Sequence, residues 1–407
     1  MKLTIKLAWR NLWRNKKRTL VTISSVLFAV LLAILFFSME QGSYDRMIDT
    51  MVRYSTGYIQ IQDVYYEDEP SIDNTLLFGE EIHTLLDKHQ DAISHYVPRL
   101  QYFSLIASEN TTRGGMVTGI EPEREVKFND LREDMVAGDF LEKGDGGVLM
   151  AEGLSDIMNL GVGDTLVLLG QGFHGTTAAG KYPVKGIIDL KIPELNNNVI
   201  YMSLEAAQWF FGAENRLTAL IIMPENPGQT QQLANLFTGE LDSQWYNVLT
   251  WEELLEDLLT LMKFDIAGTM VLMMILYLVI AFGLFGTILM MMLERQKEFG
   301  LLFSLGMKRS LLARVCMLES LFISAIGVIA GIVLAIPVVT WFTYNPIPLT
   351  GDMAGAIEDF GFEPVLPFSS DPSVFYSQGL LVMALSVLIG LFPVYKVYRL
   401  KITDVKH

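Results

Sequence analysis

The sequence has 407 residues, of which 51% are hydrophobic and 19% are charged, and its formal net charge is −16. The apolar residues are concentrated in four long runs, which excludes an ordinary soluble enzyme and indicates a membrane protein with a soluble insert. The single cysteine, Cys316, excludes an intrachain disulfide, and the five histidines lack the spacing of a zinc site. We therefore expect this chain to bind no metal.

Charge is distributed unevenly along the chain. Residues 1–19 contain seven Lys or Arg and no acid, whereas residues 40–265 contain 14 basic and 37 acidic residues, a net of −23. Because basic flanks remain on the cytoplasmic side of membrane spans, this asymmetry predicts both termini in the cytoplasm and the acidic body outside it.

The N-terminal part of the chain has the pattern of a membrane anchor. Residues 1–19 predict a basic amphipathic helix that lies on the cytoplasmic membrane surface. An uncharged apolar run of 20 residues follows, Leu20 to Met39, which is enough to span a ~30 Å hydrocarbon core. We place the first span at residues 20–40, and the lack of a small-x-small cleavage pattern favours a retained anchor over a signal peptide.

Residues 41–265 predict an extracytoplasmic α+β domain with helical stalks at both ends. Period-two alternation predicts strands near residues 57–62, 98–108, 115–120, 182–188, 198–202 and 218–223, and helical spacing predicts helices at 80–88 and 204–211. The segment Gly170 to Gly180 predicts a flexible loop. It contains a G-x-x-x-x-G-K match ending at Lys181, but Tyr182 replaces the Ser or Thr that would hold magnesium, so we expect no nucleotide site.

A capping box at Thr250–Glu253 opens the second long helix. No residue from Trp251 to about Arg295 is a strong helix breaker, which predicts one continuous helix of roughly 65 Å. We place the second span at residues 266–293 within it, and a charged cytoplasmic hairpin at residues 294–310.

The third span is predicted at residues 311–342, an extracytoplasmic loop at 343–375, the fourth span at 376–395 and a cytoplasmic tail at 396–407. Gly327 and Gly331 form a GxxxG face suited to close helix packing. Glu319 is an acid within the third span, for which pairing with Arg314 or snorkelling is at least as plausible as a functional role. The predicted fold class is an α-helical membrane protein with four transmembrane helices and an α+β extracytoplasmic domain inserted between the first and second.

This order of elements, with the hairpin sequence ERQKEFGLLFSLGMKR, resembles the FtsX/MacB-type permeases of ABC transporters, and its layout is most similar to the lipoprotein-releasing (LolC/LolE-type) permeases. The residues that match the family hairpin are Glu294, Arg295, Glu298, Gly300, Leu302, Leu305 and Gly306. Phe303 and Ser304 stand where the family has Arg and Ala.

The resemblance implies a permease that works by mechanotransmission and is not itself an enzyme. A separate dimer of ABC ATPase subunits would bind ATP and Mg, and this chain would bind no cofactor. The expected ATPase-coupling residues are Glu294, Arg295, Lys297, Glu298, Gly300, Leu302, Leu305 and Gly306. Of these, Gly300 and Gly306 are expected to bracket a short amphipathic segment at the membrane surface.

The other expected partners are a second permease (a copy or a paralogue), a lipoprotein or amphipathic substrate, a periplasmic carrier or adaptor, and membrane lipids, with no nucleic acid. The expected location is the bacterial inner membrane. Two alternatives to lipoprotein release stay open. One is export of an antibiotic or peptide with an adaptor, and the other is an FtsX-like scaffold that signals to an external partner.

Overall fold

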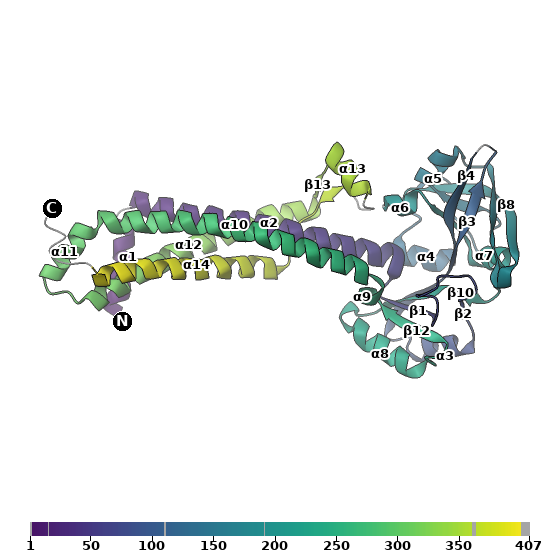
Figure 1. The fold of residues 1–407 in the computed structure, drawn as a ribbon, viewed down its shortest axis with the longest axis horizontal. Coiled ribbons are helices and arrows are strands. Elements are labelled where there is room, and N and C mark those ends of the chain that lie inside the picture. Colours follow the sequence, from purple (N-terminus) through teal and green to yellow (C-terminus); the bar gives the residue numbers. More distant parts are fainter. Residues whose placement is uncertain (1, 15, 110, 191, 360–363, 400–407) are drawn as a thin grey trace. The chain divides into compact units, whose positions relative to one another are not determined.

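The computed structural model describes residues 2–14, 16–109, 111–190, 192–359 and 364–399, and the chain folds as two compact units (Figure 1). The helical unit comprises Met1–Arg46, Leu261–Pro348 and Leu366–His407. The α/β unit comprises Met47–Thr260 and Leu349–Val365. Lys401 and Lys406 of the predicted tail lie outside the described residues.

The helical unit is a bundle in which the long helices lie side by side (Figure 1). Its helices are α1 (Lys2–Arg14), α2 (Lys16–Met51), α10 (Glu256–Glu294), α11 (Gln296–Ser304), α12 (Arg309–Tyr344) and α14 (Pro372–Arg399). Among the described residues, four helical segments are long and apolar enough to cross a membrane, namely Thr19–Thr56 (α2 with the π-helical turn after it), Glu256–Glu294, Arg309–Tyr344 and Pro372–Arg399. A buried apolar cluster drawn from α2, α10, α12 and α14 holds the bundle together.

Helices α2 and α12 pack closely at the two glycines of the GxxxG pair. A Cβ atom on Gly327 would lie 2.6 Å from Val26 Cβ, and one on Gly331 would lie 2.9 Å from the Leu27 carbonyl oxygen and from Val30 Cβ. Real side chains do not tolerate such distances, so the backbones approach here because the residues are glycines. The close-packing role predicted for this pair is confirmed, and α2 is its partner.

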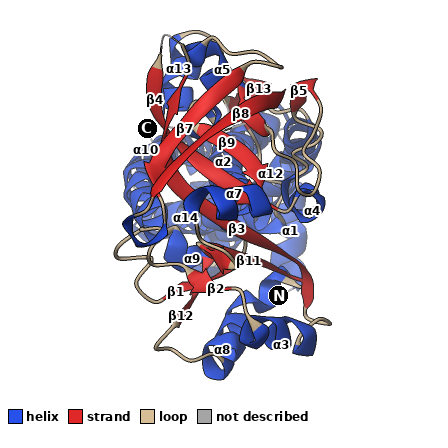
Figure 2. Cartoon of the chain, turned by 90° about the vertical axis from the view of Figure 1, so that its right-hand side faces the viewer, coloured by secondary structure: helices blue, strands red, loops and turns tan. Residues whose placement is uncertain are grey.

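The α/β unit is built on a mixed sheet with helices on its faces (Figure 2). Strand order is β12-β1-β11-β3-β4-β9-β6-β8-β5, with β7 paired to β3 and β8; β4–β9 and β6–β8 are parallel and the remaining pairs are antiparallel. The strands are β1 (Ile59–Asp63), β3 (Ile93–Ala107), β4 (Thr112–Ile120), β5 (Met135–Gly138), β6 (Val148–Ala151), β7 (Thr165–Gln171), β8 (Thr177–Ile188), β9 (Val199–Ser203), β11 (Ala219–Pro224) and β12 (Tyr246–Thr250). Two-stranded pairs are made by β2 (Leu76–Leu77) with β10 (Arg216–Leu217), and by β13 (Ile347–Pro348) with β14 (Val365–Leu366).

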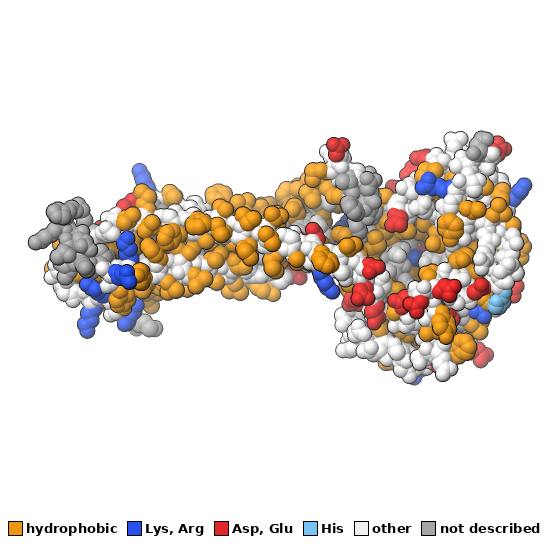
Figure 3. Space-filling view, viewed as in Figure 1, with side chains coloured by type: hydrophobic (Ala, Val, Ile, Leu, Met, Phe, Trp, Pro, Cys, Tyr) orange, Lys and Arg blue, Asp and Glu red, His pale blue; other side chains and the backbone are white. Residues whose placement is uncertain are grey.

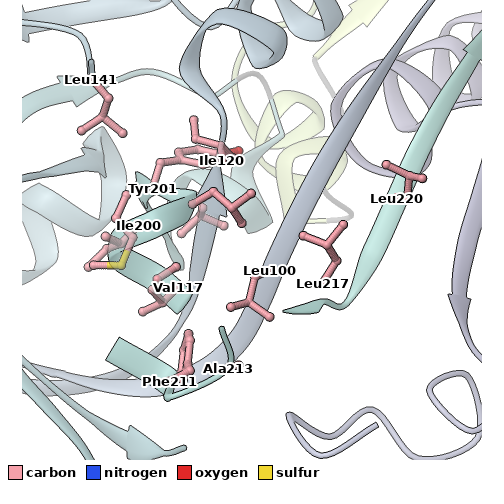
Figure 4. Packing of buried hydrophobic residues seen from close by; sticks show 14 of the residues in the cluster. Leu100, Val117, Ile120, Leu141, Ile200, Tyr201, Phe211, Ala213, Leu217 and Leu220 are labelled. Atoms are coloured by element: carbon pink, nitrogen blue, oxygen red, sulfur yellow. The ribbon is translucent and has the colours of Figure 1, made fainter. Parts of the chain in front are cut away.

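The helices of this unit are α3 (Glu80–Lys88), α4 (Pro122–Asn129), α5 (Glu152–Met158), α6 (Pro193–Asn196), α7 (Leu204–Phe211), α8 (Thr230–Glu240), α9 (Trp251–Leu254) and α13 (Asp352–Asp359), with a π-helical turn at Val52–Thr56 and 3-10 turns at Phe173–Gly175 and Pro227–Gln229. Side chains of β3, β4, β9 and α7 meet in the core, as Figure 4 shows for Leu100, Val117, Ile200 and Phe211. This continuous core explains how the unit folds without a disulfide.

The prediction for residues 170–180 is wrong. The segment Gly170–Gly180 is not a flexible loop, because β7 and β8 form a hairpin across it: Leu169 pairs with Ala179 and Gln171 pairs with Thr177. Its small residues hid the strand pattern from hydrophobic periodicity. Lys181 lies within β8, so no helix begins after it, and the arrangement required for a phosphate-binding loop is not formed.

The helix predicted to run unbroken from Trp251 is interrupted at Leu255, which has φ −106° and ψ 23°. The capping box between Thr250 and Glu253 is present, and the Trp251 N–H donates to the Tyr58 carbonyl at 3.0 Å. These bonds fix the short helix α9 to the end of β12, and α10 begins anew at Glu256.

Candidate coupling site

The hairpin between α10 and α12 is a short helix bounded by two non-helical residues. Arg295 (φ −95°, ψ 1°) ends α10, α11 follows, and Gly306 with φ +88° turns the chain toward α12. The left-handed conformation at Gly306 favours glycine. Gly300 does not bracket the segment as predicted, because it is a buried residue inside α11; Arg295 takes that boundary role.

The inner face of α11 is anchored by Phe299, whose side chain is almost fully buried. It packs in a cluster with Met292 of α10, Leu312 and Cys316 of α12, and Val397 of α14. Leu302, one of the predicted coupling residues, is half-buried at the edge of this cluster. The hairpin is therefore packed against the ends of three long helices.

A buried ion pair joins the start of the hairpin to α12. Arg295 Nη1 donates to Glu319 Oε2 at 2.5 Å, and Asn11 Nδ2 of α1 donates to Glu319 Oε1 at 2.7 Å. Arg295 and Glu319 are 7% and 3% exposed, whereas Arg314 is exposed. Pairing with Arg314 was one of the alternatives left open for Glu319, and the structure pairs this carboxylate with Arg295. Arg295, one of the expected ATPase-coupling residues, is thus buried in an ion pair inside the helical unit.

A second ion pair fastens α1 to α11. Arg14 Nη2 donates to Glu298 Oε2, and Arg295 Nε donates to the same oxygen at 3.4 Å. Between α1 and the hairpin lies a groove of about 350 Å³, lined in part by Arg14, Glu298, Leu301 and Met307. The amphipathic helix α1 is thus part of the same assembly as the hairpin, which its position in the sequence did not predict.

The outer face of α11 is apolar and exposed. Leu301 is 64% exposed and Leu305, directly after α11, is 76% exposed; Glu298 on α11 and Glu294 at the end of α10 are also exposed. The side chain of Lys297 lies outside the described part of the structure. Lys and Arg side chains gather at this end of the helical unit (Figure 3). An exposed apolar pair bordered by charges is typical of a surface that binds another protein.

Phe303 occupies the position where the family hairpin has an arginine, and a different arginine lies over it. The Arg309 guanidinium carbon is 5.8 Å from the centre of the Phe303 ring, and Arg309 Nη1 donates to the Tyr398 carbonyl at 2.6 Å. A cation is therefore retained next to this position, supplied by the first residue of α12.

Within the described ranges, no group of three or more His, Cys, Asp or Glu side chains could hold a metal ion. Phe299 packs the short helix α11 against α10, α12 and α14, and the exposed ion pair Arg14–Glu298 joins it to α1.

Comparisons with known proteins match two parts of the chain to family models. Residues 270–402 match the FtsX-like permease C-terminal family, and residues 19–239 match the MacB-like periplasmic core domain. The chain is 22% identical over 340 residues to the lipoprotein-releasing system transmembrane protein LolC of Neisseria meningitidis serogroup B, covering 79% of this chain and 78% of that protein. It is 23% identical over 298 residues to LolC of Xylella fastidiosa (Temecula1), covering 70% and 71%.

Solved structures similar to the chain include the extracellular domain of the noncanonic ABC-type transporter YknZ from Gram-positive bacteria, with a TM-score of 0.34 and 13% identity over 48% of this chain and 100% of that one. The periplasmic region of MacB from Actinobacillus actinomycetemcomitans has a TM-score of 0.37 and 12% identity over 51% and 95%. The matched families and the four apolar helices imply a bacterial inner-membrane protein. The chain belongs to the family of FtsX- and MacB-like permeases, the membrane components of ABC transporters.

Proposed function

We propose that this chain is a permease subunit that couples a separate ATPase dimer to the extraction of lipoproteins from the inner membrane, for transfer to a periplasmic carrier. The relatives that match over most of the chain are named as transmembrane proteins of lipoprotein-releasing systems, which supports this choice of cargo. The hairpin would face the cytoplasm, as the basic residues near both termini indicate.

The observation that carries the coupling proposal is the contrast between the two faces of α11. The inner face is buried through Phe299 and fixed by Arg295, whereas the outer face exposes Leu301 and Leu305. A short helix that is anchored on one side and apolar on the other can receive a partner and transmit its displacement. Charges at the rim, such as Glu294, would add specificity and speed of encounter more than affinity.

In this mechanism ATP binding brings the two ATPase subunits together and displaces α11. The displacement passes through Arg295–Glu319 and Phe299 to the ends of α10, α12 and α14, and the α/β domain changes its affinity for cargo. The substrate does not need to cross the bilayer, because ATP only shifts the population between states that bind it differently. Four membrane helices per chain are few for a transporter, so a second permease, either a copy or a paralogue, completes the membrane part of the complex.

Depletion of this chain in its own host, followed by separation of inner and outer membranes, tests the proposed cargo. We expect lipoproteins destined for the outer membrane to accumulate in the inner membrane. Normal lipoprotein sorting with new sensitivity to an antibiotic or peptide would favour an efflux complex instead. Normal sorting and loss of an external protein from its complex with this chain would favour a signalling scaffold.

A further inference from the structure

The groove of about 350 Å³ between α1 and the coupling hairpin plays no part in the proposed transmission from α11 to the bundle. Its volume falls in the range of ~300–1,000 Å³ that is usual for binding sites. Its apolar walls come from α1, α11, α12 and the turn before α12, namely Leu7, Leu301, Leu302, Met307, Leu312 and Val315. The groove is continuous with the outer face of α11, because Leu301 belongs to both.

Helix α1 carries different chemistry on its two flanks. Leu7, Asn11 and Arg14 line the groove, whereas Trp9 and Trp13, which are 47% and 45% exposed, form an aromatic stripe. At 3.6 residues per turn, Leu7 and Trp9 lie about 160° apart around the helix axis. The groove and the tryptophan stripe therefore face in nearly opposite directions.

The tryptophan stripe also lies deeper along α12 than the groove does. The ring of Trp9 packs edge-to-face against Phe322 with ring centres 5.8 Å apart, whereas the groove contacts α12 at Leu312 and Val315. Phe322 follows Val315 by seven residues, or about 10 Å of helix. Because tryptophan concentrates at the membrane–water interface, this places the groove on the water side, which the basic ends of the chain predict to be the cytoplasm. The position favours a cytoplasmic protein over a lipid as the occupant.

A row of cations borders the groove. Lys6 and Arg10 are exposed and continue, at four-residue spacing, the row that ends at Arg14. In the described part of the chain, neither Lys6 nor Arg10 forms an ion pair with an Asp or Glu. Arg14 pairs with Glu298, but these side chains are 56% and 46% exposed, and such a pair contributes little to stability. A carboxylate of a partner can therefore replace Glu298 at Arg14, and the row selects an acidic surface.

We propose that the separate ATPase docks on α1 and α11 together, with an apolar side chain in the groove and acidic side chains on Lys6 and Arg10. The proposal rests on the proposed function, because it takes α11 as the ATPase-binding helix. It adds a second contact, on a helix that precedes the first membrane span, and it states the chemistry that this contact requires of the ATPase. Because Leu12 of α1 packs with Ile323 and Asn11 binds Glu319, the ATPase would then act on α12 through two attachments.

Photo-crosslinking in the complex of the full chain with its ATPase tests which helices the ATPase contacts. The crosslinker p-benzoylphenylalanine replaces Leu7 in the groove, Leu301 on α11, or Trp13 on the opposite flank of α1. Position 13 is the matched control, because it lies on the same helix and is exposed. We expect ATPase adducts from positions 7 and 301, and only background labelling from position 13.

An affinity measurement tests the charge requirement. Lys6→Gln combined with Arg10→Gln should raise the Kd of the ATPase for the permease in nanodiscs at least about tenfold, the ratio for the loss of one hydrogen bond to a charged group. Arg314→Gln removes an exposed cation of α12 outside the groove and should leave the Kd unchanged. In about 1 M salt, where charges are screened beyond ~3 Å, the native chain and the double variant should bind alike. A loss of fold would not depend on salt in this way.

The outcomes separate this proposal from the proposed function. No ATPase adduct at position 7, a lipid adduct in its place, or an unchanged Kd in the double variant overturns the α1 contact. Adducts at position 301 in the same experiment would leave the coupling role of α11 intact. Absence of ATPase adducts at both position 7 and position 301 would contradict the coupling role as well.

Discussion

Arg295 Nη1 lies 2.5 Å from Glu319 Oε2, and this contact connects the end of α10 to the interior of α12 across the whole hairpin. Both residues are buried, and Asn11 of α1 binds the second carboxylate oxygen at 2.7 Å. A buried ion pair is costly to desolvate, so its presence is better explained by the geometry it imposes than by net stability. It fixes three helices at the point where a partner would push.

Removal of one member of this pair should destabilise the permease strongly. Arg295→Ala leaves the Glu319 carboxylate buried without its cation, at a cost of about 3–5 kcal/mol. Thermal unfolding of the purified chain, followed by tryptophan fluorescence, measures the loss. Arg314→Ala, an exposed arginine of the same helix, is the control and should change little. If Arg295→Ala unfolds at the temperature of the control, the pair does not hold the hairpin.

Side chains at the close-packing glycines should separate α2 from α12. Gly331→Leu would place its Cβ 2.9 Å from the Leu27 carbonyl oxygen, and overpacking of this kind costs about 1–3 kcal/mol. Gly283→Ala is a matched control in α10, where no atom lies within 4 Å of the added Cβ. A cysteine crosslink between α2 and α12 should form less efficiently in Gly331→Leu and normally in Gly283→Ala. Equal crosslinking in both variants would contradict the packing.

The α/β unit contains its own buried ion pair. Arg99 Nε donates to Glu125 Oε2 at 3.3 Å, Nη2 donates to Oε1, and Nη1 donates to the carbonyls of Tyr54 and Ser55 at 3.4 and 3.3 Å. We expect Glu125→Gln to lower the free energy of unfolding several times more than Glu121→Gln does. Glu121 is the control because its partner Arg124 is half-exposed, and such a pair contributes about 0–1 kcal/mol. Chemical denaturation of the full chain compares the two, and equal effects would rule out a structural role for Arg99–Glu125.

Acid should selectively weaken the contact between Lys185 and Asp145. Burial raises the pKa of the Asp145 carboxyl, but hydrogen bonds from Lys185 and the Glu142 backbone N–H outweigh it and lower this pKa below its ordinary value. The stabilisation is therefore complete above the unfolded pKa of about 3.9 and is lost as pH falls through the folded pKa. The melting temperature of the native chain should exceed that of Asp145→Asn near neutral pH, and the two should converge in acid.

The exposed pair Lys143–Glu205, 3.8 Å apart, provides the comparison for this titration. The melting temperature of Glu205→Gln should differ little from that of the native chain at any pH, because exposed ion pairs contribute little to stability. The melting temperatures of the native chain and Asp145→Asn could instead differ by the same amount at low pH as at neutral pH. That result would show that the charge of Asp145 does not cause the difference.

Local patterns predicted the membrane helices and the glycine packing because each depends on neighbouring residues along one helix. Length and apolarity define a span, and the spacing of Gly327 and Gly331 already places both on one face. The partner of Glu319 could not be found in this way. Arg314 is near in sequence, whereas Arg295 becomes near only when the hairpin folds, and Asn11 is 308 residues away.

The hairpin of β7 and β8 was missed for a related reason. Its residues after Gly170 are small or polar, and the strand is defined by pairing with Leu168 and Leu169 rather than by its own alternation. The break at Leu255 occurs in a sequence of good helix formers, so only the attachment of α9 to the sheet accounts for it. In each case a long-range contact overrode the local preference.

The central claim is that the exposed face of α11 receives the ATPase. The direct measurement is the amount of cognate ABC ATPase that co-purifies with the permease when Leu301 and Leu305 are both changed to Asp, with Arg314→Ala as control. Both variants should unfold at the native temperature because these side chains are exposed. We predict that the double variant loses the ATPase by at least about tenfold, as for the loss of an apolar hot spot, while the control retains it. ATPase bound to the double variant at the native level would contradict the account.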